Sequence, residues 1–149
     1  MQRKLRMRAV VAALAIAGSM ATAVPAAADE IGVLSARGCT GRNGPGDINA
    51  TCITVTGTGT LVQKIQGSME SVNVPIPTPI TLCGVKVNVW GKLRSGAPYN
   101  HTGTAACNYY GNAYVNWAPF TNFAANSTIC ARTYFDNQWS NAACITIRS

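Results

Sequence analysis

The chain has 149 residues and a formal net charge of +7, but four of its twelve Lys and Arg residues lie within residues 1–28. Beyond residue 28, eight basic residues accompany five acidic ones, which leaves a net charge of +3 and no basic cluster. This balance argues against a nucleic-acid partner, because nucleic-acid-binding proteins concentrate positive charge on one face or helix.

Residues 1–28 have the three parts of a secretory signal peptide. A basic start is followed by an apolar run over residues 9–23 and by three alanines at residues 26–28, an order that is typical of exported precursors. The apolar run is short and rich in alanine, and no later segment reaches about 18 consecutive apolar residues. We therefore expect a secreted, extracellular protein without a membrane span, whose mature chain begins at Asp29.

Residues 29–38 form a short, mostly apolar arm ahead of the first cysteine. Such an arm can add a strand to another protein's sheet or fill a groove, and it can equally be the first strand of its own domain. The sequence leaves both interpretations open. If the arm binds a partner, a chain that begins at Gly38 is expected to keep its thermal transition and lose the partner. The partner-binding residues are then Ile31, Gly32, Val33, Leu34, Ser35 and Ala36.

The following segments predict β-structure. Residues 53–65 are rich in Thr, Val and Ile and predict one or two strands. Three prolines at alternate positions in residues 72–80 favour an extended edge or crossing segment. Residues 82–93 and 104–117 alternate between apolar and polar side chains, which is the pattern of half-buried strands.

Residues 128–147 predict a β-hairpin whose register is set by its cysteines. If Cys130 lies opposite Cys144, then Ile129 lies opposite Ile145, because side chains alternate between the two faces of a strand. An isolated hairpin is marginal in water, so its apolar stripe needs a second sheet to pack against. That stripe consists of Ile129, Ala131, Phe135, Ile145 and Ile147.

All six cysteines lie beyond residue 28, and an even number in a small exported domain predicts three disulfides. Neighbours in sequence are the favoured partners, because each such pair brackets a turn that contains Gly or Asn. Cys83 and Cys107 fall on the apolar faces of their strands, which predicts a buried bridge. The predicted pairs are Cys39 with Cys52, Cys83 with Cys107, and Cys130 with Cys144.

No segment carries apolar residues at helical spacing, and short strands recur with turn signals between them. We therefore predict an all-β fold, a disulfide-stapled antiparallel β-sandwich of about six to eight strands. The sandwich is expected to span residues 39–149, after the signal peptide at residues 1–28 and the arm at residues 29–38.

The residues available for catalysis or metal binding are few. His101 is the only histidine, and it lies in a predicted loop without a nucleophile motif. Asp47, Glu70 and Asp136 lie in or beside predicted turns, which does not favour a carboxylate pair. With one histidine and no Cys-x-x-Cys motif, a zinc site is not expected. We predict no enzyme, no catalytic residues, no metal and no cofactor.

Four aromatic residues are candidates for stacking against a ligand. Trp90, Tyr110 and Tyr114 point away from the apolar faces of their predicted strands. Trp139 lies at the tip of the last hairpin, where an indole has little core to fill. With many asparagines nearby, these side chains fit a sugar-binding surface. The alternative is that they pack against loops or neighbouring strands.

An alanine-rich signal peptide, a short arm and a six-cysteine β domain precede the closing segments Ile-Cys-Ala-Arg-Thr-Tyr and Ala-Cys-Ile-Thr-Ile-Arg-Ser. This layout resembles the small exported β-sandwich proteins of Streptomyces, and within that group it is most similar to the small adaptor subunit of umbrella toxin particles. The resemblance implies a non-catalytic adaptor in an antibacterial toxin complex. It links a lectin subunit to a large toxin-bearing subunit, into which residues 29–37 are inserted.

Two other functions remain open on the residues alone. The aromatic residues fit a stand-alone carbohydrate-binding module. The loop between Cys39 and Cys52 fits the rigid exposed loop that a secreted protease inhibitor needs.

Overall fold

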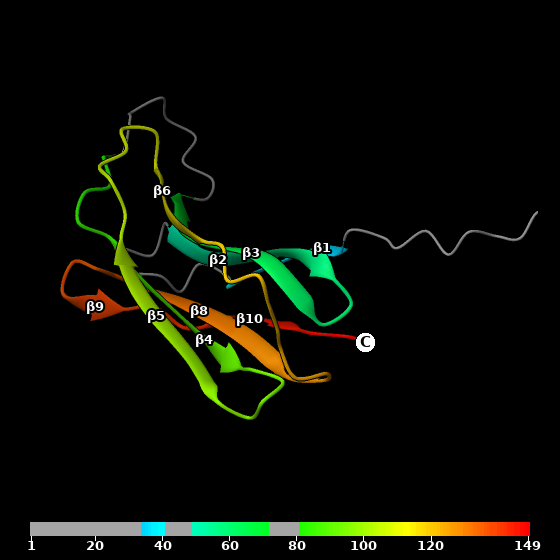
Figure 1. Cartoon of the computed structure of the whole chain (residues 1–149). Helices are drawn as coiled ribbons and strands as arrows, with labels where there is room; N and C mark the ends of the chain where they lie inside the picture. Colours follow the sequence, from blue (N-terminus) through cyan, green and yellow to red (C-terminus); the bar gives the residue numbers. More distant parts are fainter. Residues whose placement is uncertain (1–33, 41–48, 72–80) are drawn as a thin grey trace, which may run out of the picture. The chain divides into compact units, whose positions relative to one another are not determined.

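The computed structural model describes residues 34–40, 49–71 and 81–149, and they form two antiparallel β-sheets (Figure 1). This all-β sandwich with three disulfides confirms the predicted fold class. The described residues contain ten strands, of which β7 and β9 have two residues each. The predicted signal peptide lies outside the described residues.

The first sheet has the strand order β1-β2-β3-β6, and β7 pairs with Leu61 and Val62 at the start of β3, on the same edge as β6. β1 pairs with β2 along its whole length, from Leu34 opposite Gly57 to Cys39 opposite Cys52. The chain from Leu34 onward is therefore a strand of this sheet, and the sheet begins before the expected boundary at residue 39. The strands are β1 (Leu34–Cys39), β2 (Asn49–Thr58), β3 (Leu61–Ser71), β6 (Asn112–Trp117) and β7 (Thr121–Asn122).

The second sheet has the order β10-β8-β4-β5, and β9 pairs with the end of β8. Its β8–β10 pairing sets Cys144 opposite Cys130 and Ile145 opposite Ile129, which confirms the predicted register. A two-residue turn, Asp136 and Asn137, connects β8 to β9. Both residues have a positive φ, as a type I′ hairpin turn requires. The strands are β4 (Lys86–Lys92), β5 (Pro98–Thr104), β8 (Thr128–Phe135), β9 (Gln138–Trp139) and β10 (Ala143–Thr146).

The inner faces of the two sheets supply one apolar core. The largest fully buried side chain is Phe123, which follows β7 and packs edge-on against Tyr99 with ring centroids 5.2 Å apart. Burial of these side chains is the main term that favours the folded sandwich. Other buried core residues are Ile53, Val55, Ile65, Met69, Leu82, Val85, Val87, Val89, Ile129 and Ala131.

Glycines allow the sheet edges to approach each other on both sides of the sandwich. A Cβ at Gly38 on β1 would lie 2.9 Å from the carbonyl oxygen of Cys144 on β10. A Cβ at Gly103 on β5 would lie 2.7 Å from a methyl group of Val115 on β6. Each closing contact therefore depends on a position without a side chain.

The three disulfides join the predicted partners, Cys39 with Cys52, Cys83 with Cys107 and Cys130 with Cys144. The expectation that the Cys83–Cys107 bridge is buried is wrong, because both cysteines are exposed. Gly84, at φ +70°, breaks the alternation of buried and exposed side chains, so Leu82 is buried and Cys83 is exposed. Gly111, at φ +69°, likewise separates the second cysteine from the strand that follows it.

A buried relay of three hydroxyls joins the two sheets. The hydroxyl of Thr51 on β2 donates to Ser140 Oγ at 2.6 Å, and Ser140 Oγ donates to the carbonyl of Asn141 at 2.9 Å. Thr133 Oγ1 on β8 lies 2.6 Å from Thr51 Oγ1 and 3.3 Å from Ser140 Oγ, to which it donates. Buried polar groups satisfied in this way fix how the sheets align.

Replacing Thr51 with valine should lower the free energy of unfolding by about 1 to 3 kcal/mol, because the buried partners lose a donor and an acceptor. Urea denaturation of the oxidised protein measures the loss. Thr54→Val is the matched control, since Thr54 lies half-buried on the outer face of the same strand. Equal effects of the two substitutions would show that the relay contributes nothing.

Candidate functional site

A groove opens where the edge strands β1 and β10 face each other. We call it the seam groove, and its volume is about 400 Å³. This lies within the size range of small-molecule and peptide-side-chain sites, which are mostly lined by apolar groups. Its apolar lining comes from β1, the β2–β3 hairpin and the C-terminal segment. The apolar lining residues are Ala36, Val55, Leu61, Val62, Ile145 and Ile147.

A β-bulge shapes the hairpin that lines the seam groove. The register of β2 with β3 shifts between Thr56 and Gly57, and a bulge of this kind bends a strand and increases its twist. Gly57 is required at this point, because a Cβ would lie only 2.0 Å from the carbonyl oxygen of Leu61. The sequence thus places a bend in the part of the strand pair that borders the groove.

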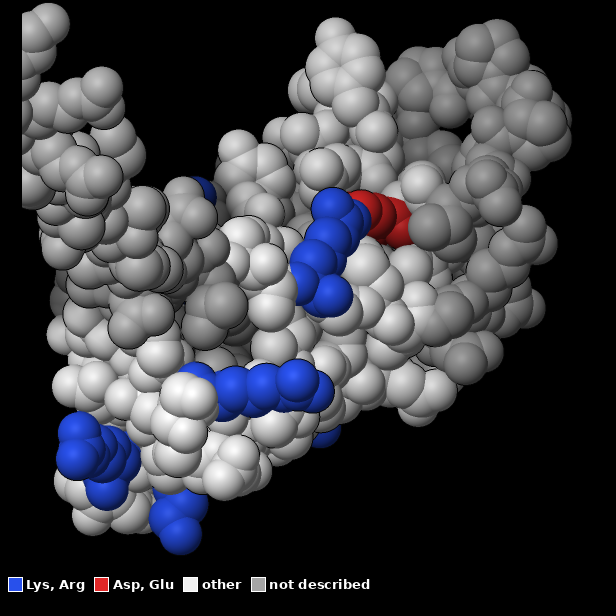
Figure 2. All heavy atoms as spheres, turned by 90° about the vertical axis from the view of Figure 1, so that its right-hand side faces the viewer, with Lys and Arg blue, Asp and Glu red and all other residues white. Residues whose placement is uncertain are grey.

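Two arginines, Arg37 and Arg148, also line the seam groove. Arg148 is exposed and has no ion-pair partner among the residues that the structure describes. Figure 2 shows the face that carries the start of β1 and the C-terminus, and basic side chains are more numerous there than acidic ones. The groove therefore combines an apolar floor with a basic rim, which suits an apolar segment that carries an acidic residue.

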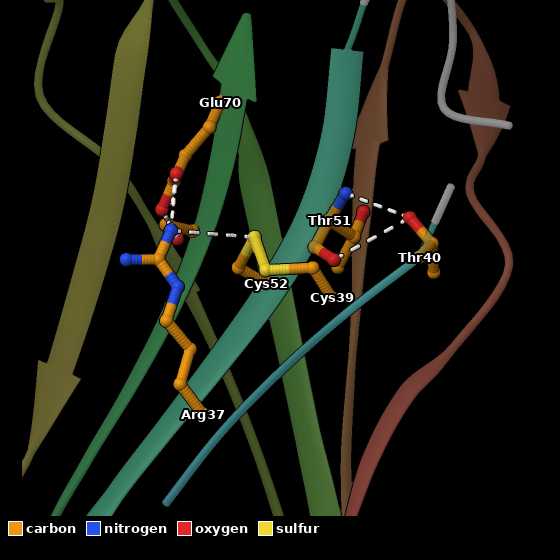
Figure 3. Close-up of polar contacts among 7 residues, drawn as sticks. Arg37, Cys39, Thr40, Thr51, Cys52 and Glu70 are labelled. Atoms are coloured by element: carbon orange, nitrogen blue, oxygen red, sulfur yellow. Dashed lines mark hydrogen bonds and ion pairs between the residues drawn. A yellow bond between two sulfur atoms is a disulfide. The ribbon is translucent and has the colours of Figure 1, made fainter. Parts of the chain in front are cut away.

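A polar network anchors β1 beside the groove (Figure 3). Arg37 Nη2 donates to Glu70 Oε2 at 2.5 Å and contacts Cys52 Sγ at 3.6 Å. Ser68 Oγ donates to the other oxygen of Glu70 at 2.8 Å. At the end of β1, the hydroxyl of Thr40 accepts a 3.0 Å hydrogen bond from a backbone N–H of β2. This half of β1 is therefore held by side chains and a disulfide as well as by the sheet.

The residues expected to bind a partner lie partly in this strand. Leu34, Ser35 and Ala36 belong to β1, and Ala36 packs against the core and lines the groove. The alternative of an ordinary first strand therefore holds for this part of the arm. Ile31, Gly32 and Val33 lie outside the described residues, and their part in binding stays a prediction.

The four candidate stacking residues do not form one surface. Trp90 and Trp139 come together on the second sheet, because both contact the side chain of Arg132. Tyr114 lies on β6 opposite Ser68 in the first sheet, and Tyr110 lies in the loop before it. Both tyrosines are exposed. A continuous platform that includes all four side chains is therefore not present.

Asp47 lies outside the described residues, and the other residues considered for catalysis lie on different elements. His101 lies in β5 and not in the predicted loop. Pro98, which suggested a turn there, is the first residue of this edge strand, a position where proline is tolerated. The ring of His101 contacts that of Tyr99 in a tilted arrangement with centroids 4.4 Å apart, and burial raises the pKa of that tyrosine. Glu70 lies in β3 and is paired with Arg37, while Asp136 lies in the β8–β9 turn. Within residues 34–40, 49–71 and 81–149, no group of His, Cys, Asp and Glu could hold a metal.

Two predicted segments are outside the described part of the chain. The candidate inhibitory loop includes residues 41–48, and the proline-rich segment is residues 72–80. Of the loop, the structure describes only residues 39–40 and 49–52, with the Cys39–Cys52 disulfide at its base.

No protein-family model, curated protein or solved structure matches this chain. Among the described residues, no helix has the length and apolar character needed to cross a membrane. The three disulfides indicate an oxidising environment, such as that outside the cytoplasm.

Proposed function

We propose that the mature protein is a secreted, non-catalytic adaptor that holds a segment of another secreted protein in the seam groove. The observation that supports this most is the apolar groove with a basic rim, built between two edge strands of a disulfide-stapled sandwich. The resemblance to umbrella toxin adaptors suggests the roles of the partners. The large toxin-bearing subunit is then the groove partner, and the lectin subunit binds elsewhere.

An extended segment is the occupant that suits this groove. Edge strands offer unpaired backbone groups to an added strand, and alternate side chains of that strand would reach the apolar floor. Each buried aliphatic side chain contributes roughly 1.5 to 3 kcal/mol before the cost of ordering the segment is subtracted. An acidic residue of the segment would meet Arg148 at the rim.

Arg148→Glu should weaken the complex about tenfold, because it reverses the charge that the acidic residue of the partner meets. The test compares affinity-tagged variants in culture medium and identifies captured proteins by mass spectrometry, followed by titration of the captured partner. Arg94→Glu is the matched control, since Arg94 is also exposed, lies after β4 and does not line the groove.

Equal losses for the two variants would show that net charge, and not the groove, controls binding. An unchanged complex with Arg148→Glu would place the partner on another surface.

A further inference from the structure

Aromatic and basic side chains form a row on the outer face of the second sheet. We call it the cation–aromatic row, and it draws on three strands. The face is the outer one because the neighbouring residues of these strands, such as Val89 and Ala131, are buried in the core. In order, the row consists of Trp90 on β4, Arg132 on β8, Trp139 on β9, Tyr134 on β8 and Lys86 on β4.

Two indole rings hold the guanidinium of Arg132. Its Cζ lies 4.3 Å from the ring centroid of Trp139 and 5.6 Å from that of Trp90. Tyr134 continues the row at 5.1 Å from Trp139, and Lys86 Nζ lies 5.6 Å from the tyrosine ring. Guanidinium groups stack favourably on aromatic faces, and stacking restricts how the planar group is oriented.

The hydrogen-bonding capacity of Arg132 is unused. Its Nε is buried without a partner, and its guanidinium makes no hydrogen bond or ion pair with any residue that the structure describes. Arg37 differs, because its guanidinium is paired with Glu70. A guanidinium carries five N–H donors, and buried donors without acceptors are costly. The Nη groups of Arg132 are not among the buried atoms, so they are the donors that an external acceptor with a planar, two-oxygen group can reach.

Amide and hydroxyl groups lie beside the row. Asn88, directly opposite Arg132 in the sheet, donates from Nδ2 to Asn100 Oδ1 at 2.7 Å and to Thr102 Oγ1 at 3.0 Å. Both acceptor residues are exposed on β5. Trp139 is 37% exposed, which leaves part of an indole surface for stacking. A sheet face with indole, amide and hydroxyl groups suits a sugar ring and its hydroxyls.

We propose that the cation–aromatic row binds a saccharide that carries a carboxylate, a uronic acid unit of an acidic polysaccharide. The carboxylate accepts two hydrogen bonds from the guanidinium of Arg132, the pairing that the planar fork favours. The sugar ring contacts Trp139, and its hydroxyls meet the polar groups around Asn100. This site is separate from the seam groove and does not depend on the adaptor function.

The test titrates the full mature protein with oligomers of galacturonate, glucuronate and mannuronate, and with the methyl esters of the same oligomers. Tryptophan fluorescence and calorimetry measure binding. At least one acidic oligomer should bind ten times or more tightly than its neutral ester. Arg132→Gln should weaken that binding at least tenfold, and Arg132→Lys should not restore it, because lysine keeps the charge without the planar fork. Arg94→Gln, which removes one charge elsewhere, should leave binding unchanged.

A readout on the unmodified protein keeps the test valid if the Arg132 variants do not fold. The side-chain Nε–H resonance of Arg132 should shift when the acidic oligomer is added and not when its ester is added. Absence of binding to all three acidic oligomers would overturn the proposal, as would equal affinity for acid and ester. Equally tight binding of inorganic phosphate would also overturn it, since the site would then select an anion and not a saccharide.

Discussion

A chain that begins at Gly38 should unfold at a markedly lower temperature than the mature chain. The truncation removes Leu34 to Arg37, and with them the strand pairing to the second half of β2, the core contact of Ala36 and the ion pair with Glu70. Each ladder hydrogen bond contributes about 1 kcal/mol, so we expect a loss on the order of 3 to 5 kcal/mol. Total stabilities of such domains are on the order of 5 to 15 kcal/mol. Thermal and urea denaturation of the oxidised proteins measure the effect.

A chain that begins at Leu34 is the control, because it keeps all of β1 and the same three disulfides. Its thermal midpoint should match that of the mature chain. If the Gly38 chain also kept that midpoint, β1 would contribute nothing to stability, and the interpretation of residues 29–38 as an independent arm would gain support.

The closing hairpin could be predicted in detail because its determinants are local. Cys130 and Cys144 are joined within one strand pair, and alternation then assigns a face to every neighbour, including Ile129 and Ile145. The same reasoning from short sequence separations identified the other two disulfides. Covalent cross-links and period-two patterns are therefore sufficient for the all-β class.

Alternation failed where a glycine with positive φ interrupts a strand. The pattern of residues 104–117 looks continuous in the sequence, but the strand begins only at Asn112, after Gly111. Gly84 has the same effect before β4. A sequence pattern does not reveal such a break, because glycine is also compatible with an extended strand.

Neither candidate site could be assembled from the sequence, because each depends on contacts between distant strands. Trp90, Arg132 and Trp139 become neighbours only when β4 pairs with β8. The strands β5, β6 and β7 lie between these two in the sequence. The seam groove likewise needs β1 and the C-terminal segment to meet. The outward position of Trp90 was predictable from alternation, whereas its arginine partner was not.

Gly67→Ala should destabilise the sandwich, and Val87→Ala should relieve part of that effect. Gly67 lies at the centre of β3, and its Cβ would be 2.4 Å from a methyl group of Val87 on the facing sheet. Ala131 and Val89 also lie within 3.6 Å of that position, so the facing sheet has little room to move. We expect a loss of about 3 kcal/mol for Gly67→Ala, at the upper end for overpacked cores.

The coupling between the two positions is what identifies the steric cause. Val87→Ala alone creates a cavity and should lower stability by about 2 to 4 kcal/mol. In the double variant the new methyl group occupies space that Val87 has vacated, so the combined loss should be smaller than the sum by about 1 kcal/mol or more. Urea denaturation of the four proteins provides this cycle. Strictly additive losses would mean that the cost at Gly67 comes from its backbone, and that the facing sheet moves away freely when a side chain is added.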